Sequence, residues 1–87
     1  MHKLWTDEAW DDYIWWQSQD KKTLRRINML IKESERDPFN GIGKPERLSG
    51  NLAGMVSRRI DQKNRLVFAV MDDHLVIYSC RDHYGDK

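Results

Sequence analysis

Residues 55–84 carry three runs in which apolar side chains alternate with other types, and this alternation constrains the fold most. A period of two is typical of strands that bury one face. The odd positions mix smaller apolar residues with serine, arginine and histidine. The even positions carry branched and aromatic residues suited to a core, namely Val56, Ile60, Leu66, Phe68, Val70, Val76, Tyr78 and Cys80. We therefore expect three short antiparallel strands whose even face covers the core.

The lengths of the two turns decide whether the polar residues of the odd face meet. A one-residue slip turns the side chains of a strand to the opposite face. We expect three or five residues in the first turn, around residues 61–64, and three in the second, residues 72–74. Even-numbered turns would scatter the polar groups unless β-bulges restored them. With the expected turns, one face holds Arg59, Arg65, Arg81 and His83.

Two helices are expected before these strands. Residues 1–5 alternate enough for a short edge strand, and Thr6 is a suitable N-cap for a helix that runs to about Ser18. Asp20 caps a second helix, which Pro38 ends. The second helix should bury Leu24, Ile27, Leu30, Ile31 and Ser34. The first should bury Ala9, Trp10, Tyr13, Ile14 and Trp16 or Gln17, with Trp15 outside the stripe, either exposed for a partner or partly covered.

The order strand, two helices, loop, three strands predicts an α+β fold. A helix hairpin should pack on one face of a small antiparallel sheet. The loop of residues 39–49 holds two glycines and a proline, with a short extended piece expected near residues 46–48. A chain of 87 residues fits a single domain, residues 1–87. The odd face of the sheet then stays free for a ligand.

Charge is distributed unevenly along a chain whose net charge is only +1. Residues 1–20 sum to −4, residues 21–66 to +7 and residues 67–87 to −2. A basic middle in a nearly neutral protein indicates a local patch for phosphate and argues against attraction of the whole surface to DNA or a membrane. By charge alone, an ordinary solvated face is the more common explanation.

Several classes of site and location are excluded by composition. The single Cys80 allows neither a disulfide framework nor a cysteine-based metal site, and His2 and His74 lack the spacing of metal ligands. The N-terminus has no apolar run long enough for a signal peptide or a membrane span. We therefore expect a cytoplasmic protein that uses no metal and no cofactor.

The basic patch and its neighbours match the needs of metal-independent RNA cleavage. That reaction requires a base for the 2′-hydroxyl proton, an acid for the leaving 5′-oxygen, and cations on the phosphate. Glu46 is the candidate base, beside Lys44 and Arg47, and His83 is the candidate acid because imidazole titrates near neutrality. The phosphate and base contacts would come from Arg59, Arg65 and Tyr84.

Each candidate also has an ordinary structural explanation. Glu46 resembles a solvated loop glutamate, and a histidine near a chain end is usually a surface residue. The two arginines could form surface ion pairs with Asp61 or Asp82, and Tyr84 could be a C-terminal anchor. Only the combination of base, acid and cations makes the chemical hypothesis substantial.

Six short runs, in the same order and spacing, resemble the YoeB toxins of the RelE/ParE superfamily of bacterial toxin–antitoxin systems. The resemblance covers essentially the whole chain. It departs from the family pattern at Ser49, at residues 55–56, and in the three residues after Tyr84. The matching runs are W-x-x-x-x-W-D-D-Y (residues 5–13), DPF-x-G-x-GKPE (37–46), NL-x-G (51–54), SRRI (57–60), RLV (65–67) and CR-x-HY (80–84).

This resemblance implies a microbial-ribonuclease-like, RelE-like fold and a toxin that cleaves messenger RNA in the ribosomal A site. The implied partners are the ribosome, a cognate antitoxin whose C-terminal segment covers the site, a second copy of the chain, and operator DNA contacted through the antitoxin complex. The implied roles are Glu46 as general base, His83 as general acid, Arg65 as transition-state stabiliser, Arg59 as second phosphate ligand, Tyr84 as closing tyrosine and Lys44 as basic neighbour.

Two alternatives remain open from the sequence. A non-catalytic inhibitor of the same superfamily, of the gyrase-targeting type, would act by binding a protein. Such proteins generally lack the combination of a glutamate with a C-terminal histidine and tyrosine, which this chain has as Glu46, His83 and Tyr84. A plain RNA-binding domain would keep its activity when Glu46 is changed to glutamine.

Overall fold

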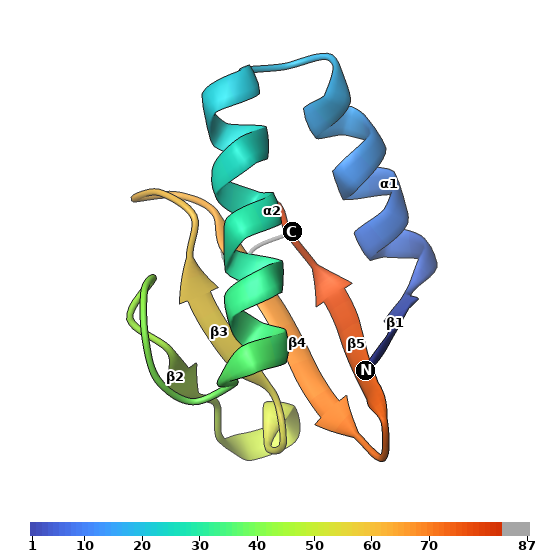
Figure 1. Cartoon of the computed structure of the whole chain (residues 1–87), viewed down its shortest axis with the longest axis vertical. Coiled ribbons are helices and arrows are strands. Elements are labelled where there is room, and N and C mark those ends of the chain that lie inside the picture. The colour runs from blue at the N-terminus through green and yellow to red at the C-terminus, as the bar shows by residue number, and fades with distance from the viewer. Residues whose placement is uncertain (83–87) are drawn as a thin grey trace.

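Five strands form one sheet with two α-helices on one of its faces in residues 1–82, the part of the chain that this computed structural model describes (Figure 1). The strand order across the sheet is β1-β5-β4-β3-β2. The predicted α+β class with a helix hairpin is confirmed. The elements in chain order are β1 (His2–Trp5), α1 (Asp7–Gln17), α2 (Lys21–Arg36), β2 (Glu46–Arg47), the 3-10 helix η1 (Gly50–Leu52), β3 (Val56–Arg59), β4 (Arg65–Met71) and β5 (His74–Ser79).

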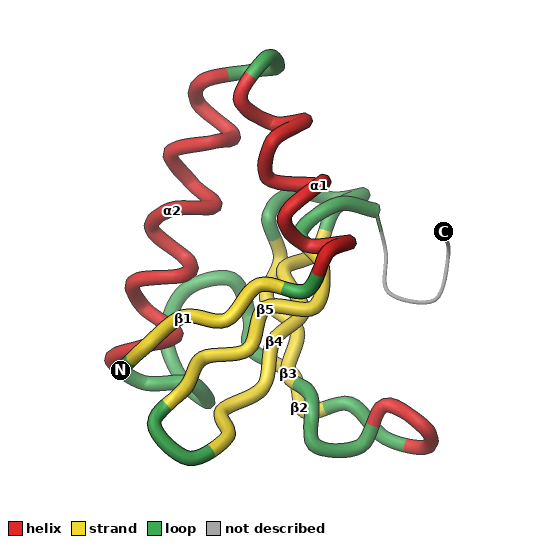
Figure 2. Tube along the Cα trace, turned by 90° about the vertical axis from the view of Figure 1, so that its right-hand side faces the viewer, coloured by secondary structure: helices red, strands yellow, loops and turns green. Residues whose placement is uncertain are grey.

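The sheet was predicted to be antiparallel, and this is wrong for one pair: the N-terminal strand β1 pairs in parallel with β5, while the other neighbouring strands are antiparallel, so the sheet is mixed. β1 is an edge strand, as predicted, and the short β2 forms the other edge. Viewed from the side, both helices lie on one side of the sheet and η1 projects beyond the β2 edge (Figure 2). No helix within residues 1–82 has the length and apolar character needed to cross a membrane.

Side-chain caps fix the ends of the helices where the sequence predicts them. The Thr6 hydroxyl oxygen accepts a hydrogen bond from the Ala9 N–H at 3.0 Å. The Asp20 carboxylate accepts from the N–H groups of Lys22 and Thr23, both at 3.2 Å. The Thr23 hydroxyl and these N–H groups lower the pKa of the Asp20 carboxyl. These caps satisfy N–H groups that have no partner within the helix.

Helix α2 buries the predicted stripe. Ile27, Leu30, Ile31 and Ser34 are buried, and Leu24 packs on the core from its edge. The Ser34 hydroxyl donates to the Leu30 carbonyl at 2.7 Å, so this polar residue is satisfied inside the stripe. The apolar residues of α2 pack on one sheet face, which leaves the opposite face uncovered by helices.

The predicted stripe of α1 is right for Ala9, Tyr13 and Trp16, which are buried or pack on the core, and wrong for the other residues. Trp10 and Ile14 are 47% and 50% exposed, and Gln17 is exposed, while Ala9, Asp12 and Trp16 face inward. The reason is a polar contact with the end of β5. The Trp16 indole N–H donates to the Cys80 carbonyl at 2.7 Å, and the Cys80 N–H donates to the Asp12 carboxylate at 3.0 Å. Helix α1 therefore turns Asp12 and Trp16 inward and leaves Trp10 and Ile14 exposed.

The first turn has five residues, one of the two predicted lengths, because Arg59 pairs with Arg65. The second turn was predicted with three residues, and this is wrong. Met71 pairs with His74, which leaves a two-residue turn with Asp72 at a φ of 55°. Leu75 and Ile77 of β5 therefore face the core in place of the predicted Val76 and Tyr78.

A β-bulge corrects the alternation before β5 ends. Phe68 pairs with Ile77 and Val67 pairs with Ser79, so β5 has one extra residue at this point. Beyond the bulge, Ser79 lies on the open face and the side chain of Cys80 enters the core. An even-numbered turn and one bulge thus compensate each other. The end of β5 reaches the face that the sequence predicts for it.

Candidate active site

Glu46, Arg59 and Arg65 share the sheet face that points away from the helices. Glu46 pairs with Ser57, and Arg59, two residues further along β3, pairs with Arg65. Residues two apart in a strand lie on the same face. Glu46 is therefore a diagonal neighbour of Arg59, a relationship that places side chains about 7–8 Å apart. The register brings together the candidate base and both candidate phosphate ligands.

The two arginines stand directly opposite each other without a carboxylate between them. The ion pairs within residues 1–82 are Lys3 with Glu35 and Arg36 with Glu33. The alternative in which Arg59 and Arg65 pair with Asp61 or Asp82 is therefore not observed in this part of the chain. Like charges directly opposite on a sheet are destabilising. A bound anion would convert this repulsion into attraction.

Arg65 is held in place by the turn that precedes it. Its Nη1 donates to the carbonyl oxygens of Asp61, Gln62 and Asn64 at 2.8, 3.3 and 3.2 Å. These bonds use one nitrogen of the guanidinium. Its other nitrogens have no hydrogen-bond partner within the described residues. A donor fixed before the substrate arrives needs no rearrangement in the reaction.

The turn itself is built on the Asp61 carboxylate. It accepts hydrogen bonds from the backbone N–H groups of Lys63 and Asn64, at 2.9 and 2.6 Å, and from the Asn64 side chain. Burial on its own would raise the pKa of the Asp61 carboxyl, but the hydrogen bonds from Asn64 and Lys63 outweigh it and lower the pKa. The ionised form is therefore the one that organises the turn.

Asn64 links this turn to the chain beyond β5. Its side-chain oxygen accepts from the Asp82 N–H at 2.7 Å, and the Arg65 N–H donates to the Asp82 carbonyl at 3.0 Å. Asp82 is thereby fixed beside Arg65. The predicted acid His83 and the predicted Tyr84 follow it directly in sequence. Both lie outside the described residues, so their roles remain predictions.

Arg81 does not join the other arginines. Its guanidinium stacks over the ring of Trp15, with 3.7 Å from the guanidinium carbon to the ring centroid. The prediction that Arg81 shares the face of Arg59 and Arg65 is wrong. A cation over an indole ring is an attractive contact that the strand alternation does not include. The same contact leaves Trp15 partly buried, which is one of the two alternatives expected for it.

Lys44 belongs to the site and Arg47 does not. The Gly43 carbonyl, just before Lys44, accepts from the Arg59 N–H at 2.6 Å, so exposed Lys44 lies next to Arg59. Arg47 pairs with Val56, whose side chain faces the core, so Arg47 points to the opposite face from Glu46. The expectation that Arg47 supplies charge to Glu46 is therefore wrong.

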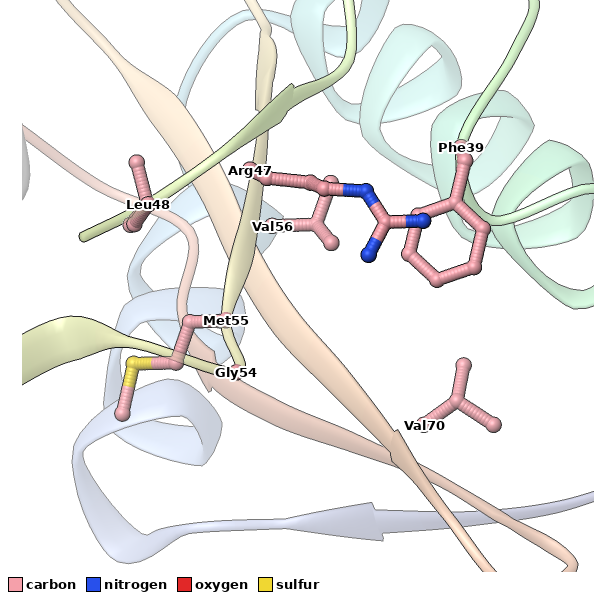
Figure 3. Close-up of a pocket in the computed structure, with 7 residues that line it drawn as sticks. All are labelled: Phe39, Arg47, Leu48, Gly54, Met55, Val56 and Val70. Atoms are coloured by element: carbon pink, nitrogen blue, oxygen red, sulfur yellow. The ribbon is translucent and has the colours of Figure 1, made fainter.

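Arg47 instead lines a pocket of about 200 Å³ on the helix side of the sheet. Its guanidinium carbon lies 3.9 Å from the centroid of the Phe39 ring (Figure 3). The pocket is lined by Phe39, Arg47, Leu48, Gly54, Met55, Val56 and Val70.

Within residues 1–82 no three His, Cys, Asp or Glu side chains gather in a way that could hold a metal ion.

Sequence reasoning missed several residues that support this site. Asp12, Trp16 and Asn64 hold residues 80–82, and Arg58 is buried beneath the sheet with 0% exposure. One signal was present for Arg58. It is a charged residue at an even position of β3, where alternation predicts a residue of the core. A buried arginine needs partners, and alternation does not show where they are.

Comparison with known proteins fits this arrangement. The chain matches the family of YoeB-like toxins of bacterial type II toxin–antitoxin systems over residues 5–84. It is 54% identical over 84 residues to Toxin YoeB of Escherichia coli (strain K12), covering 97% of this chain and 100% of that protein. The chain belongs to the YoeB toxin family. Ribonuclease activity is typical of YoeB toxins.

Solved structures of YoeB proteins share the fold along their length. The YoeB/ParE toxin from Agrobacterium tumefaciens superimposes with a TM-score of 0.93 at 44% identity, covering 97% of this chain and 100% of that one. A YoeB dimer and a heterotetrameric YoeB–YefM toxin–antitoxin complex, both from Staphylococcus aureus, give TM-scores of 0.89 and 0.88 at 44% identity, each covering 97% of this chain and 98% of that one. The predicted family and fold are confirmed.

Proposed function

We propose that this YoeB-family toxin is a ribosome-dependent endoribonuclease that cleaves messenger RNA in the A site without a metal ion. The observation that carries the proposal is the arrangement of Glu46 beside the opposed pair Arg59 and Arg65. A carboxylate next to two guanidinium groups that form no ion pair within residues 1–82 would put a base beside a phosphate site. The charges therefore suit transfer chemistry at a phosphodiester.

The reaction uses these groups in one displacement. The Glu46 carboxylate takes the proton of the 2′-hydroxyl, and the 2′-oxygen attacks the adjacent phosphorus. The bond from phosphorus to the 5′-oxygen breaks, and His83 donates a proton to that leaving oxygen. Arg65 and Arg59, with Lys44 nearby, neutralise the charge that builds on the phosphate oxygens. The products are a 2′,3′-cyclic phosphate and a free 5′-hydroxyl.

The proposed dependence on the ribosome is based on the exposure of the site residues within residues 1–82. Glu46, Arg59 and Lys44 are all exposed. The pocket beside β2 opens on the other side of the sheet from these residues. Exposed charges on their own do not hold a flexible RNA strand in one orientation. A messenger held in the A site would arrive already positioned, which removes the entropic cost of orienting it.

Protein partners are proposed from the relatives. The Staphylococcus aureus YoeB proteins were solved as a dimer and with the antitoxin YefM. Exposed apolar residues of this chain, among them Leu4, Trp10 and Ile14, give a surface that protein contacts could cover. We propose a cognate antitoxin that covers the active site, a homodimer, and operator DNA contacted only through the antitoxin complex.

The test is primer extension on a defined message in a reconstituted translation reaction, with and without ribosomes. Wild type is compared with Glu46→Gln and His83→Gln, and Asp11→Asn serves as a matched carboxylate control because Asp11 is exposed on α1. Breaks should appear in the A-site codon only with ribosomes and fade in the first two variants alone.

The ends of the fragments test the chemistry separately. Polynucleotide kinase should label the 3′ fragments without prior phosphatase treatment, because their 5′-hydroxyls are free. Translation that stops with the message uncut would identify an inhibitor that acts by binding, and Glu46 and His83 would then be contacts rather than catalytic groups. Undiminished cleavage by Glu46→Gln would remove Glu46 from the role of base.

A further inference from the structure

We propose that Arg58 is a positioning residue for Glu46: its buried guanidinium holds the connection between α2 and β2 in the path that delivers Lys44 and Glu46 to the active face. This inference rests on the proposed function for its catalytic consequence. The structural part, that Arg58 orders residues 37–45, stands on contacts within the described chain.

Arg58 is buried to a degree that is rare for arginine. It is 0% exposed and pairs with Leu66 across β3 and β4, on the face that packs against the helices. Its Nη2 donates to the carbonyl oxygens of Asp37 and, at 2.9 Å, Asn40. Its Nη1 donates to the Ile42 carbonyl at 2.8 Å. All three acceptors belong to the connection between α2 and β2.

Charge around Arg58 supports a fixed guanidinium. Burial lowers the pKa of Arg58, while the carboxylates of Glu33 and Asp37 act to raise it. An arginine remains protonated in proteins even so. Its Nε is buried and has no partner within the described residues. The buried Arg58 side chain thus loses its hydration and leaves its Nε without a partner within the described residues, while its guanidinium donates to three carbonyl oxygens of one loop.

The connection has few other supports. The Asp37 side chain accepts from the Phe39 N–H at 3.3 Å near its start, and the Arg59 N–H donates to the Gly43 carbonyl near its end. Between these points, the Arg58 guanidinium supplies the contacts to the backbone. Strand β2, which follows, is only two residues long, and its pairing with β3 continues in one further hydrogen bond, from the Leu48 N–H to the Met55 carbonyl. The position of Glu46 therefore depends also on how the preceding loop is held.

The fit between the loop and Arg58 is close. Gly43 has a φ of 81°, and a Cβ atom there would lie 2.9 Å from Leu30 Cδ2 and 3.2 Å from Arg58 Cβ. A Cβ atom on Gly41 would lie 3.5 Å from Arg58 Nη1. The loop backbone thus packs directly on the arginine. A change in the guanidinium is expected to move the loop rather than be absorbed by neighbouring space.

Strand β3 connects this buried contact to the site through its alternation. Ser57 pairs with Glu46 on the open face, Arg58 faces inward, and Arg59 returns to the open face beside the phosphate position. The strand therefore presents a phosphate ligand on one side and the support for the base on the other. Lysine cannot replace the planar guanidinium of Arg58 and its several donors, because a single ammonium is a point charge on a flexible stem.

The test compares Arg58→Lys and Arg58→Met with Arg25→Lys, a control on the exposed face of α2. Single-turnover cleavage on programmed ribosomes should be slowed about 10–100-fold at saturating toxin in Arg58→Lys, since a misplacement of about 1 Å can cost 100-fold. The toxin concentration for half-saturation should change little, because Arg59 and Arg65 still meet the phosphate. Arg25→Lys should match wild type in both values.

A nitrogen–proton correlation spectrum gives the second readout, independent of activity. In Arg58→Lys the amide signals of Gly41, Gly43 and Arg59 should shift and exchange faster with solvent. The indole signal of Trp16, which reports the core at Cys80, should stay in place. This pattern separates local displacement from loss of the fold. Arg58→Met, which keeps the volume but not the donors, should show the same loop changes more strongly.

Two outcomes overturn the inference. Wild-type cleavage by Arg58→Lys would show that the fork does not position Glu46. A Trp16 indole signal that moves together with the glycine signals would show that Arg58 supports the whole core rather than the loop. If wild type itself fails to cleave, the proposed function fails, and the loop signals alone then decide whether Arg58 orders residues 37–45.

Discussion

The sharpest test of how the fold holds the end of β5 is Trp16→Phe. The Trp16 indole N–H donates to the Cys80 carbonyl at 2.7 Å, and Trp16 and Cys80 are 6% and 0% exposed. Phenylalanine keeps an aromatic ring in the same place but removes the donor. The variant therefore leaves a buried carbonyl without this partner and leaves a gap where the larger ring was.

The expected loss of stability is the sum of two terms. Removal of the Trp16 donor from this buried hydrogen bond costs about 1–3 kcal/mol. The gap left by the smaller ring adds about 1 kcal/mol. The total of about 2–4 kcal/mol corresponds to a fall in Tm of about 8–30 °C for a domain of this size. Residues 80–82, which precede His83, should loosen first.

Thermal unfolding followed by circular dichroism measures this fall, at one protein concentration so that any dimer formation is held constant. Trp10→Phe is the matched control. Trp10 is 47% exposed, so this substitution removes the same atoms from the surface of α1. It should change stability by no more than about 0.5 kcal/mol. Equal losses in the two variants would refute the reasoning, because the buried hydrogen bond would then contribute nothing.

Three further predictions concern the site. The folded pKa of Asp61 is lowered, so its stabilisation is present above the unfolded value of about 3.9 and is lost as pH falls through the folded pKa. Asp61→Asn should make the free energy of unfolding fall less steeply as the pH is lowered, as measured by unfolding at a series of pH values. Arg59→Gln should slow cleavage yet leave stability unchanged or higher by about 0.2–1 kcal/mol in urea, because like charges no longer oppose; lower stability would contradict this. Asn64→Ala should cost about 1–2 kcal/mol and slow cleavage in the same assays, and Asn64→Asp should not restore either value, because its carboxylate would face the ionised Asp61 carboxylate.

Local sequence signals predict the helices well, because their determinants are local. Thr6 and Asp20 cap the helices as expected, and Pro38 follows the end of α2. The apolar period of α2 is strong and matches its buried face. The period of α1 is weak, since apolar residues occur on several sides of it, and a hydrogen bond from Trp16 to a residue 64 positions away decides its orientation. No local pattern contains that contact.

The site could be predicted in part for a similar reason. The five-residue first turn fixes Arg59 opposite Arg65, and the pairing of Glu46 with Ser57 then puts the carboxylate on the same face. Alternation did not reveal the two-residue second turn or the bulge. Each of them reverses the faces of β5, and the two reversals cancel by the end of the strand. Arg81 was misplaced because alternation assigns a face but not the attraction of a guanidinium for the Trp15 ring.

The supports of the site lie on the opposite side of the sheet from its charges, and this separation has a physical cause. Arg59, Arg65 and Lys44 gather positive charge on an open face, which destabilises the unbound toxin. A net charge of only +1 means that long-range attraction to RNA is weak. Under the proposed function, RNA binding would then come from short-range contacts to a phosphate already in position. Such contacts need donors that do not move, and the buried hydrogen bonds of Arg58 and Trp16 hold the loop that precedes Lys44 and the end of β5 at Cys80.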